Sequence, residues 1–148
     1  MGDLIDQLTA HPGLYSGSQT DPTITSEATP SVARVTVTAL PGGSGVSLDY
    51  EVLSPQNGRV HSEHTVLART PNGTILVTAH SHAGLASVLH ETEAGYFPAI
   101  AGEAPFPMAI RLEVPEPRRL VYSWSYSAPG EELVVRDVGT LNLVTAPT

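Results

Sequence analysis

The chain has 148 residues, 7 Lys+Arg against 15 Asp+Glu, a formal net charge of −8 and no cysteine. Without cysteine, disulfides, thiolate metal sites and cysteine nucleophiles are excluded, and since all seven basic residues are arginine, Schiff-base lysines are excluded as well. The negative charge disfavours nucleic acid as a partner. The sequence shows neither a long apolar run nor a signal-peptide pattern, so we expect one cytoplasmic domain over residues 1–148 that does not bind a membrane.

The first predicted element is a short helix. Asp3 is a good N-cap for residues 4–10, in which leucine and isoleucine recur at helical spacing. The run His11-Pro12-Gly13 then ends the helix.

The rest of the chain predicts strands, because apolar residues alternate with period two and Val, Thr and Ile are frequent. Consecutive hairpins whose edges must be covered favour an all-β fold, a closed up-and-down antiparallel β-barrel of about ten strands, calycin- or lipocalin-like. Segment 21–30 is polar and irregular, which predicts a loop and a candidate lid over one mouth of the barrel. The predicted strands are 14–18, 32–39, 45–53, 59–69, 74–82, 86–92, 95–100, 107–114, 119–127, 131–138 and 140–145.

The strand around residues 120–127 carries the chain's only tryptophan. Strict alternation places Tyr122, Trp124 and Tyr126 on one face and serines on the other. This aromatic stripe has two interpretations: it forms part of the barrel core, or it forms one wall of an apolar cavity whose two hydroxyls orient a ligand.

The hairpin over residues 59–82 brings histidines near one another in a way that depends on its register. A type I turn with a glycine bulge sets His64 opposite His80 and gathers His64, His80 and His82 on one face. A two-residue Asn72-Gly73 turn instead sets His64 opposite Ser81 and aligns the more apolar faces. The proline before this turn favours the first register, which we adopt.

Three converging imidazoles would be compatible with a zinc, iron or copper site. The spacing lacks the glutamate that follows His-x-His in the cupin signature, so we predict hydrogen-bonded or pocket-lining histidines and no metal. His61 and Glu63 alternate with His64, and we expect them to form a solvated or barrel-end pair.

Several short motifs resemble those of known barrel families. The run Gly13-Leu14-Tyr15-Ser16-Gly17 resembles the Gly-x-Trp-x-Gly opening of calycin barrels, with tyrosine in place of tryptophan. Further motifs resemble, in the same order, the strands of nitrobindin-like barrels, which are fatty-acid-binding-protein-like. They are His61-Ser62-Glu63 with Arg69, Thr78-Ala79-His80 with Gly84, and Leu120-x-Tyr122-x-Trp124-x-Tyr126.

This resemblance implies a ten-stranded barrel that holds haem b near one mouth, with ferric haem carried by a histidine of the last hairpin and linked to nitric oxide and peroxynitrite chemistry. Residues 131–139 contain no histidine. Arg136 falls nearest the expected position, and its guanidinium stays protonated and does not ligate iron. A haem would then need Tyr126, His64, His80 or His82 as its ligand.

Three hypotheses follow. In the first, the barrel binds a small hydrophobic or amphipathic ligand between Tyr122, Trp124 and Tyr126, and His64, His80, His82 or Arg136 fixes its head group. In the second, it is a nitrobindin-like haem protein of the peroxynitrite isomerase kind. In the third, it is a cofactor-free enzyme with a pocket histidine as general base. A homodimer is compatible with all three.

Overall fold

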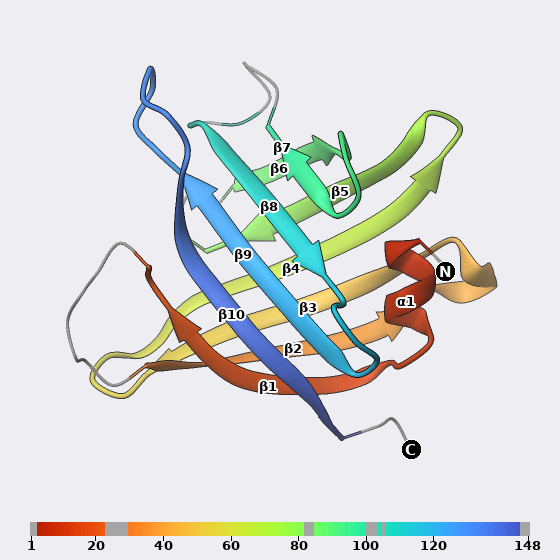
Figure 1. Ribbon diagram of the computed structural model, residues 1–148, viewed down its shortest axis with the longest axis horizontal. Helices are drawn as coiled ribbons and strands as arrows, with labels where there is room; N and C mark the ends of the chain where they lie inside the picture. Colours follow the sequence, from red (N-terminus) through yellow and green to blue (C-terminus); the bar gives the residue numbers. More distant parts are fainter. Residues whose placement is uncertain (1–2, 23–29, 82–84, 100–103, 105, 146–148) are drawn as a thin grey trace.

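The structure, a computed structural model, describes residues 3–22, 30–81, 85–99, 104 and 106–145 (Figure 1). It consists of a short helix followed by ten antiparallel strands, with a 3-10 turn at Pro41–Gly43. Most of the predicted loop 21–30 lies outside the described residues. The elements are α1 (Leu4–Thr9), β1 (Gly13–Thr20), β2 (Ser31–Ala39), β3 (Gly45–Ser54), β4 (Gly58–Thr70), β5 (Gly73–His80), β6 (Leu85–His90), β7 (Tyr96–Pro98), β8 (Met108–Glu113), β9 (Arg119–Tyr126) and β10 (Val134–Thr145).

The strands form one curved sheet in the order β6-β5-β4-β3-β2-β1-β10-β9-β8-β7. Strands β1 to β6 each pair with the next strand in the chain, as do strands β7 to β10, whereas β6 and β7 do not pair; β1 also pairs with β10. The sheet thereby curls into a nearly closed barrel with β6 and β7 at its two edges. The predicted up-and-down barrel with an N-terminal helix is confirmed, although the predicted strands 131–138 and 140–145 form a single strand, β10.

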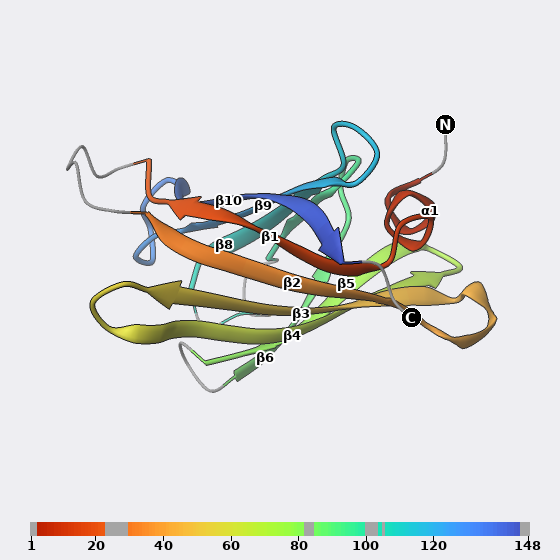
Figure 2. The same ribbon diagram turned by 90° about the horizontal axis from the view of Figure 1, so that it is seen from below.

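Helix α1 lies at one end of the barrel, and the β9–β10 hairpin lies at the other (Figures 1 and 2). Leu4, Ile5 and Leu8 point from the helix into the core, where each is at most 8% exposed. Asp3 caps the helix as predicted, since its Oδ1 accepts a hydrogen bond of 2.9 Å from the backbone N–H of Asp6. We call the end of the barrel at which α1 lies the capped end.

The Gly-x-Tyr-x-Gly run has a structural explanation at the start of β1. A Cβ atom on Gly17 would lie 1.8 Å from the carbonyl oxygen of Thr140, so the close approach of β10 requires glycine there. Tyr15 is buried, and its hydroxyl donates a hydrogen bond of 2.6 Å to the carbonyl oxygen of His11, which anchors the chain as it leaves the helix.

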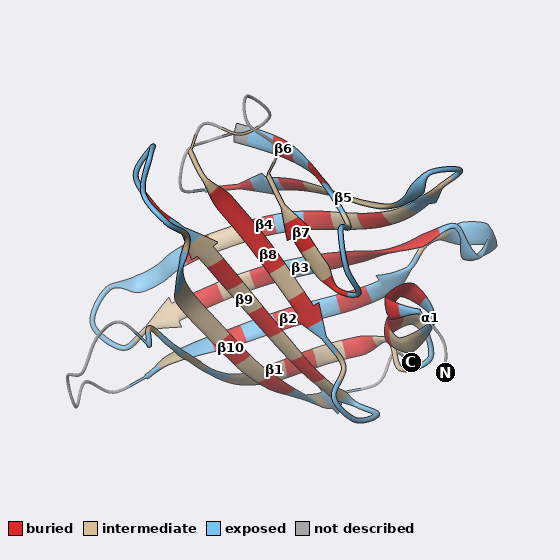
Figure 3. Ribbon diagram, turned by 45° about the horizontal axis from the view of Figure 1, so that its top comes forward, coloured by how far each residue is buried: buried red, intermediate tan, exposed pale blue. Residues whose placement is uncertain are grey.

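On β4, β5 and β9, the side chains that face the barrel interior change in character along the strand. Figure 3 shows where the buried positions lie on each strand. Near the capped end these side chains are aliphatic, and toward the opposite end they become polar or aromatic. This change runs from Leu67 to Thr65, Glu63 and His61 on β4, from Leu76 to Thr78 and His80 on β5, and from Leu120 to Tyr122 and Trp124 on β9. Among the described residues, no helix has the length and apolarity needed to cross a membrane.

Candidate functional site

The register of the β4–β5 hairpin differs from both registers considered from the sequence. Thr70 pairs with Gly73, so the loop has only two residues, and Glu63 rather than His64 lies opposite His80. Glycine suits this tight turn because its φ is 119°. The more polar face of the hairpin therefore points inward, and the predicted pairing of His64 with His80 is wrong.

This register separates the predicted histidines. His64 lies opposite Ala79, and its exposed ring makes a 2.5 Å contact between Nδ1 and the Oδ1 of Asp49, which is also exposed. His80 is buried on the inner face. His82 lies outside the described residues. The structure therefore does not bring His64 and His80 together into one site.

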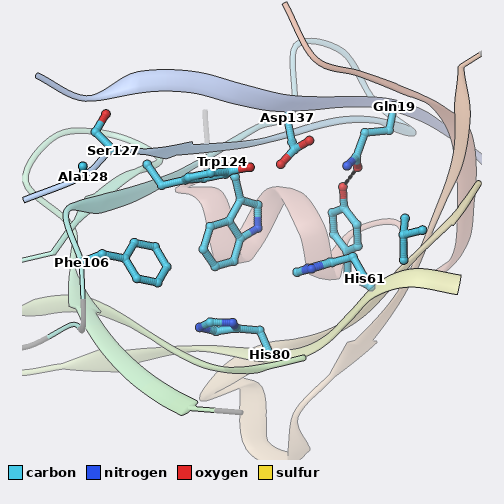
Figure 4. Close-up of a pocket in the computed structure, with 11 residues that line it drawn as sticks. Gln19, His61, His80, Phe106, Trp124, Ser127, Ala128 and Asp137 are labelled. Carbon is cyan, nitrogen blue, oxygen red and sulfur yellow. Dashed lines mark hydrogen bonds between the residues drawn. The ribbon is translucent and has the colours of Figure 1, made fainter. Parts of the chain in front are cut away.

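A cavity of about 510 Å³ lies inside the barrel at the end opposite α1, which we call the open end (Figure 4). Its walls come from the ends of β1, β5 and β9, from the starts of β4 and β10, and from β3 and the segment before β8. In Figure 4, Trp124, His80, Phe106, His61 and Asp137 surround one central space. The lining residues are Gln19, Tyr50, Val60, His61, His80, Phe106, Trp124, Tyr126, Ser127, Ala128 and Asp137.

The aromatic residues of β9 point inward as the alternation predicts, at three depths. Tyr126 lies at the mouth and is 37% exposed, whereas Trp124 lines the cavity and is 6% exposed. Tyr122 is fully buried and lies deeper, with its ring edge-on to that of Tyr50 at 4.5 Å between centroids. The stripe is therefore divided: Tyr122 belongs to the core, whereas Trp124 and Tyr126 line the cavity, so one of the two tyrosine hydroxyls does not reach a ligand there.

The most unusual group beneath the cavity is the carboxylate of Glu63, whose side chain has no exposed surface. Oε1 accepts hydrogen bonds of 2.9 Å from Nε2 of His61 and from Nε1 of Trp124. Oε2 accepts hydrogen bonds from three hydroxyls: Tyr122 at 2.5 Å, Thr65 at 2.5 Å and Thr78 at 3.1 Å. Since an ionised carboxylate can only accept, the proton of the first bond lies on the imidazole.

These contacts decide the charge of Glu63. Burial alone would raise its pKa, but the hydrogen bond and charge of His61 and the hydroxyls of Thr65 and Tyr122 outweigh burial, so the pKa lies below its ordinary value. Glu63 is therefore an anion at neutral pH. For Tyr122, burial and then the charge of Glu63 raise the pKa well above its ordinary value, so this phenol stays a neutral donor.

Two of the side chains that donate hydrogen bonds to Glu63 also line the cavity. His61 lines the cavity while its Nε2 is held by Glu63, and Trp124 lines it while its Nε1 is held by the same carboxylate. His80 packs edge-on against Trp124, with 5.3 Å between ring centroids. The buried carboxylate therefore fixes the orientation of two side chains that a cavity ligand would touch.

A bulge in β10 decides which charged residue enters the cavity. Val135 pairs with Ser125, but Trp124 pairs with Asp137, so Arg136 is the extra residue between them. Without this bulge, alternation would place the arginine inside; with it, the aspartate faces inward beside Trp124 (Figure 4). Arg136 instead lies over the ring of Tyr126, 5.8 Å from its centroid, and is not among the cavity-lining residues.

The last hairpin and Tyr126 do not supply the haem ligand that the resemblance implies. The segment 127–137 contains no histidine, methionine or cysteine, and Arg136 cannot ligate iron. A tyrosine ligand must lose its proton, but burial, and then the charges of Asp137 and Asp21, raise the pKa of Tyr126. Of the other ligands named from the sequence, His64 lies on the outer surface and His80 lines the cavity, so the mismatch concerns the last hairpin and Tyr126.

Sequence reasoning missed several lining residues. His61 and Glu63 were expected to form a solvated or barrel-end pair; they do form a pair, but both are buried, and five donors satisfy the carboxylate. Two threonines could have indicated the buried carboxylate: Thr65, two residues after Glu63 on β4, and Thr78, which pairs with Thr65 on β5. Hydroxyls that face inward need a buried acceptor. Asp137 could be found only by locating the bulge, and Tyr50, Gln19 and Phe106 carry no local signature.

Comparison with known proteins supports the fold. No protein-family model matches the chain, and a search of curated proteins finds no match. Among solved structures, the chain is similar to the crystal structure of Rv2717c from M. tuberculosis, with a TM-score of 0.62 and 20% sequence identity over 97% of this chain and 100% of that chain. At this identity the likeness shows a shared barrel architecture and nothing about the ligand.

Proposed function

We propose that the protein is a binding module that holds a small, mainly apolar ligand in the cavity at the open end. The observation that carries the proposal is the cavity itself, whose volume of about 510 Å³ lies in the range typical of small-molecule sites. Its placement at one barrel mouth, opposite a helix-capped end, is also typical of ligand-binding barrels.

The walls of the cavity have the composition that such ligands need. Val60, Phe106, Trp124 and Tyr126 supply apolar and aromatic surface, and burial of that surface drives binding. A few polar groups converge on the same space and would orient the ligand, among them His61, which Glu63 holds in place.

The proposal is tested by filling the mouth of the cavity. N-phenyl-1-naphthylamine, an uncharged dye that fluoresces in apolar surroundings, serves as the probe. Val60→Phe should weaken its binding at least about tenfold, which corresponds to a loss of about 1.4 kcal/mol. Val88→Phe is the matched control, because Val60 and Val88 are both 41% exposed and only the former lines the cavity.

Absence of dye binding to the unmodified protein would overturn the proposal. So would equal binding to the Val60→Phe and Val88→Phe variants, because the dye would then occupy another surface. Circular dichroism of both variants checks that the barrel is intact.

A further inference from the structure

The cavity lining contains one acidic side chain, Asp137, and two imidazoles, His61 and His80, but neither arginine nor lysine. The chain has no lysine, and all seven arginines lie among the described residues, none of them in the cavity lining. Six have recorded contacts elsewhere: Arg34 and Arg59 with Glu51, Arg69 with Asp3 and Asp6, Arg111 with Glu93, Arg119 with Glu116, and Arg136 over Tyr126. An acidic ligand would therefore meet no guanidinium or ammonium group inside.

Two carboxylates act on the cavity instead. Asp137 lines the wall, and Figure 4 shows its carboxylate directed into the central space from β10. Its negative charge contributes to raising the pKa of Tyr126, after burial, and the pKa of Tyr50, after burial and the charge of Glu63. Glu63 adds a second negative charge behind His61 and Trp124.

The walls around these carboxylates are aromatic. Tyr50, Phe106, Trp124 and Tyr126 come from four different segments of the chain and line the same space. The face of an aromatic ring attracts cations, and tryptophan and tyrosine do so most strongly. Neutral phenols keep this property, and the raised pKa values of Tyr50 and Tyr126 keep both phenols neutral.

From the inward Asp137, the aromatic walls and the absence of arginine and lysine in the lining, we infer that the cavity selects an organic cation, an amphipathic amine with an apolar body, over the matching carboxylic acid. This inference rests on the proposed function, because it names the ligand class of the same cavity. The bulge that exchanges Arg136 for Asp137 at the wall is the feature that sets the preference. The ammonium group would lie near Asp137, and the apolar body would lie against Trp124 and Phe106.

The test compares two probes that share an alkyl length and differ in charge. Decylamine and decanoate are titrated at neutral pH, below micelle-forming concentrations, against the protein loaded with N-phenyl-1-naphthylamine. We expect decylamine to displace the dye at a concentration at least about tenfold lower than decanoate does. Equal potency, or stronger displacement by decanoate, would overturn the inference while leaving the dye-binding cavity in place.

A pair of variants assigns the preference to the cavity carboxylate. Asp137→Asn should reduce the advantage of decylamine about tenfold, because it removes the charge nearest the bound ammonium. Asp49→Asn is the matched control, since it removes one negative charge from the outer surface, beside His64. If both variants change the ratio of the two probes equally, the selectivity comes from the net charge of the molecule and the inference is wrong. Failure of the dye to bind at all would instead count against the proposed function.

Discussion

The two ends of the barrel are built from the same strands but are stabilised in different ways. At the capped end, aliphatic side chains such as Leu67 and Leu76 belong to the same hydrophobic core as the helix residues Leu4, Ile5 and Leu8. These contacts are non-directional, so any residue of similar volume could serve there. Few of these aliphatic side chains could bind a ligand specifically.

At the open end, the inward positions of the same strands carry groups that must find specific partners. Glu63 is stable in the interior only because its five donors come from β4, β5 and β9 at once. The comparison indicates that the capped end supplies stability, whereas the open end uses part of that stability to hold polar groups beside a cavity.

The largest effect should follow from a cavity made at the capped end. Leu8 is 1% exposed, so Leu8→Ala should lower the free energy of unfolding by about 3 kcal/mol. The affinity for N-phenyl-1-naphthylamine should remain unchanged, because the helix lies at the other end. Urea denaturation and dye titration measure the two quantities. A loss of dye affinity in the folded variant would show that the two ends are not independent.

The next effect should come from the carboxylate beneath the cavity. Glu63→Gln keeps the size of the side chain but removes the charge and leaves some of the five donors without an acceptor, so unfolding should become easier by about 2 kcal/mol. Glu113→Gln, at a half-exposed position, is the control and should change little. Equal stabilities of the two variants would contradict the structural role of the network.

The same carboxylate makes the difference in stability depend on pH. The pKa of Glu63 is lower in the folded protein than in the unfolded chain, where it is about 4.3. Its stabilisation is therefore complete above that value and is lost as the pH falls through the folded pKa. The gap between the original protein and Glu63→Gln should shrink progressively below about pH 4.3 in acid titrations of unfolding. A gap that widens there would reverse the assigned shift.

The smallest effect should come from the anchor between helix and barrel. Tyr15→Phe removes the 2.6 Å hydrogen bond to the carbonyl oxygen of His11 and should lower the free energy of unfolding by about 1 kcal/mol. Dye affinity should again be unchanged. An effect as large as that of Leu8→Ala would mean that this bond, rather than apolar packing, holds the helix on the barrel.

The barrel was predictable from the sequence because its signals are local. Alternation, turn residues and the N-cap Asp3 are each decided by neighbouring residues, and so is the inward orientation of Trp124. The aliphatic half of each strand also follows the usual pattern of apolar residues inside.

The site was less predictable because it depends on register. One residue of register moves every side chain of a strand to the other face, so the shorter turn before Gly73 exchanges His64 for Glu63 in the interior. By the same rule, the bulge at Arg136 places Asp137, in place of Arg136, on the inner face of β10. Neither the proline before the turn nor the apolar pattern indicates this register, because the inward polar residues are satisfied by partners on distant strands.

The central claim, that the open end is a ligand cavity, is tested most directly through the chain's only tryptophan. Trp124 lines the cavity and its Nε1–H is bonded to Glu63, so one indole resonance in a nitrogen–proton NMR spectrum reports on this place. Titration with N-phenyl-1-naphthylamine should shift that resonance in step with dye fluorescence, and Val60→Phe should weaken both responses together. Saturating dye fluorescence with an unmoved indole resonance would contradict the claim.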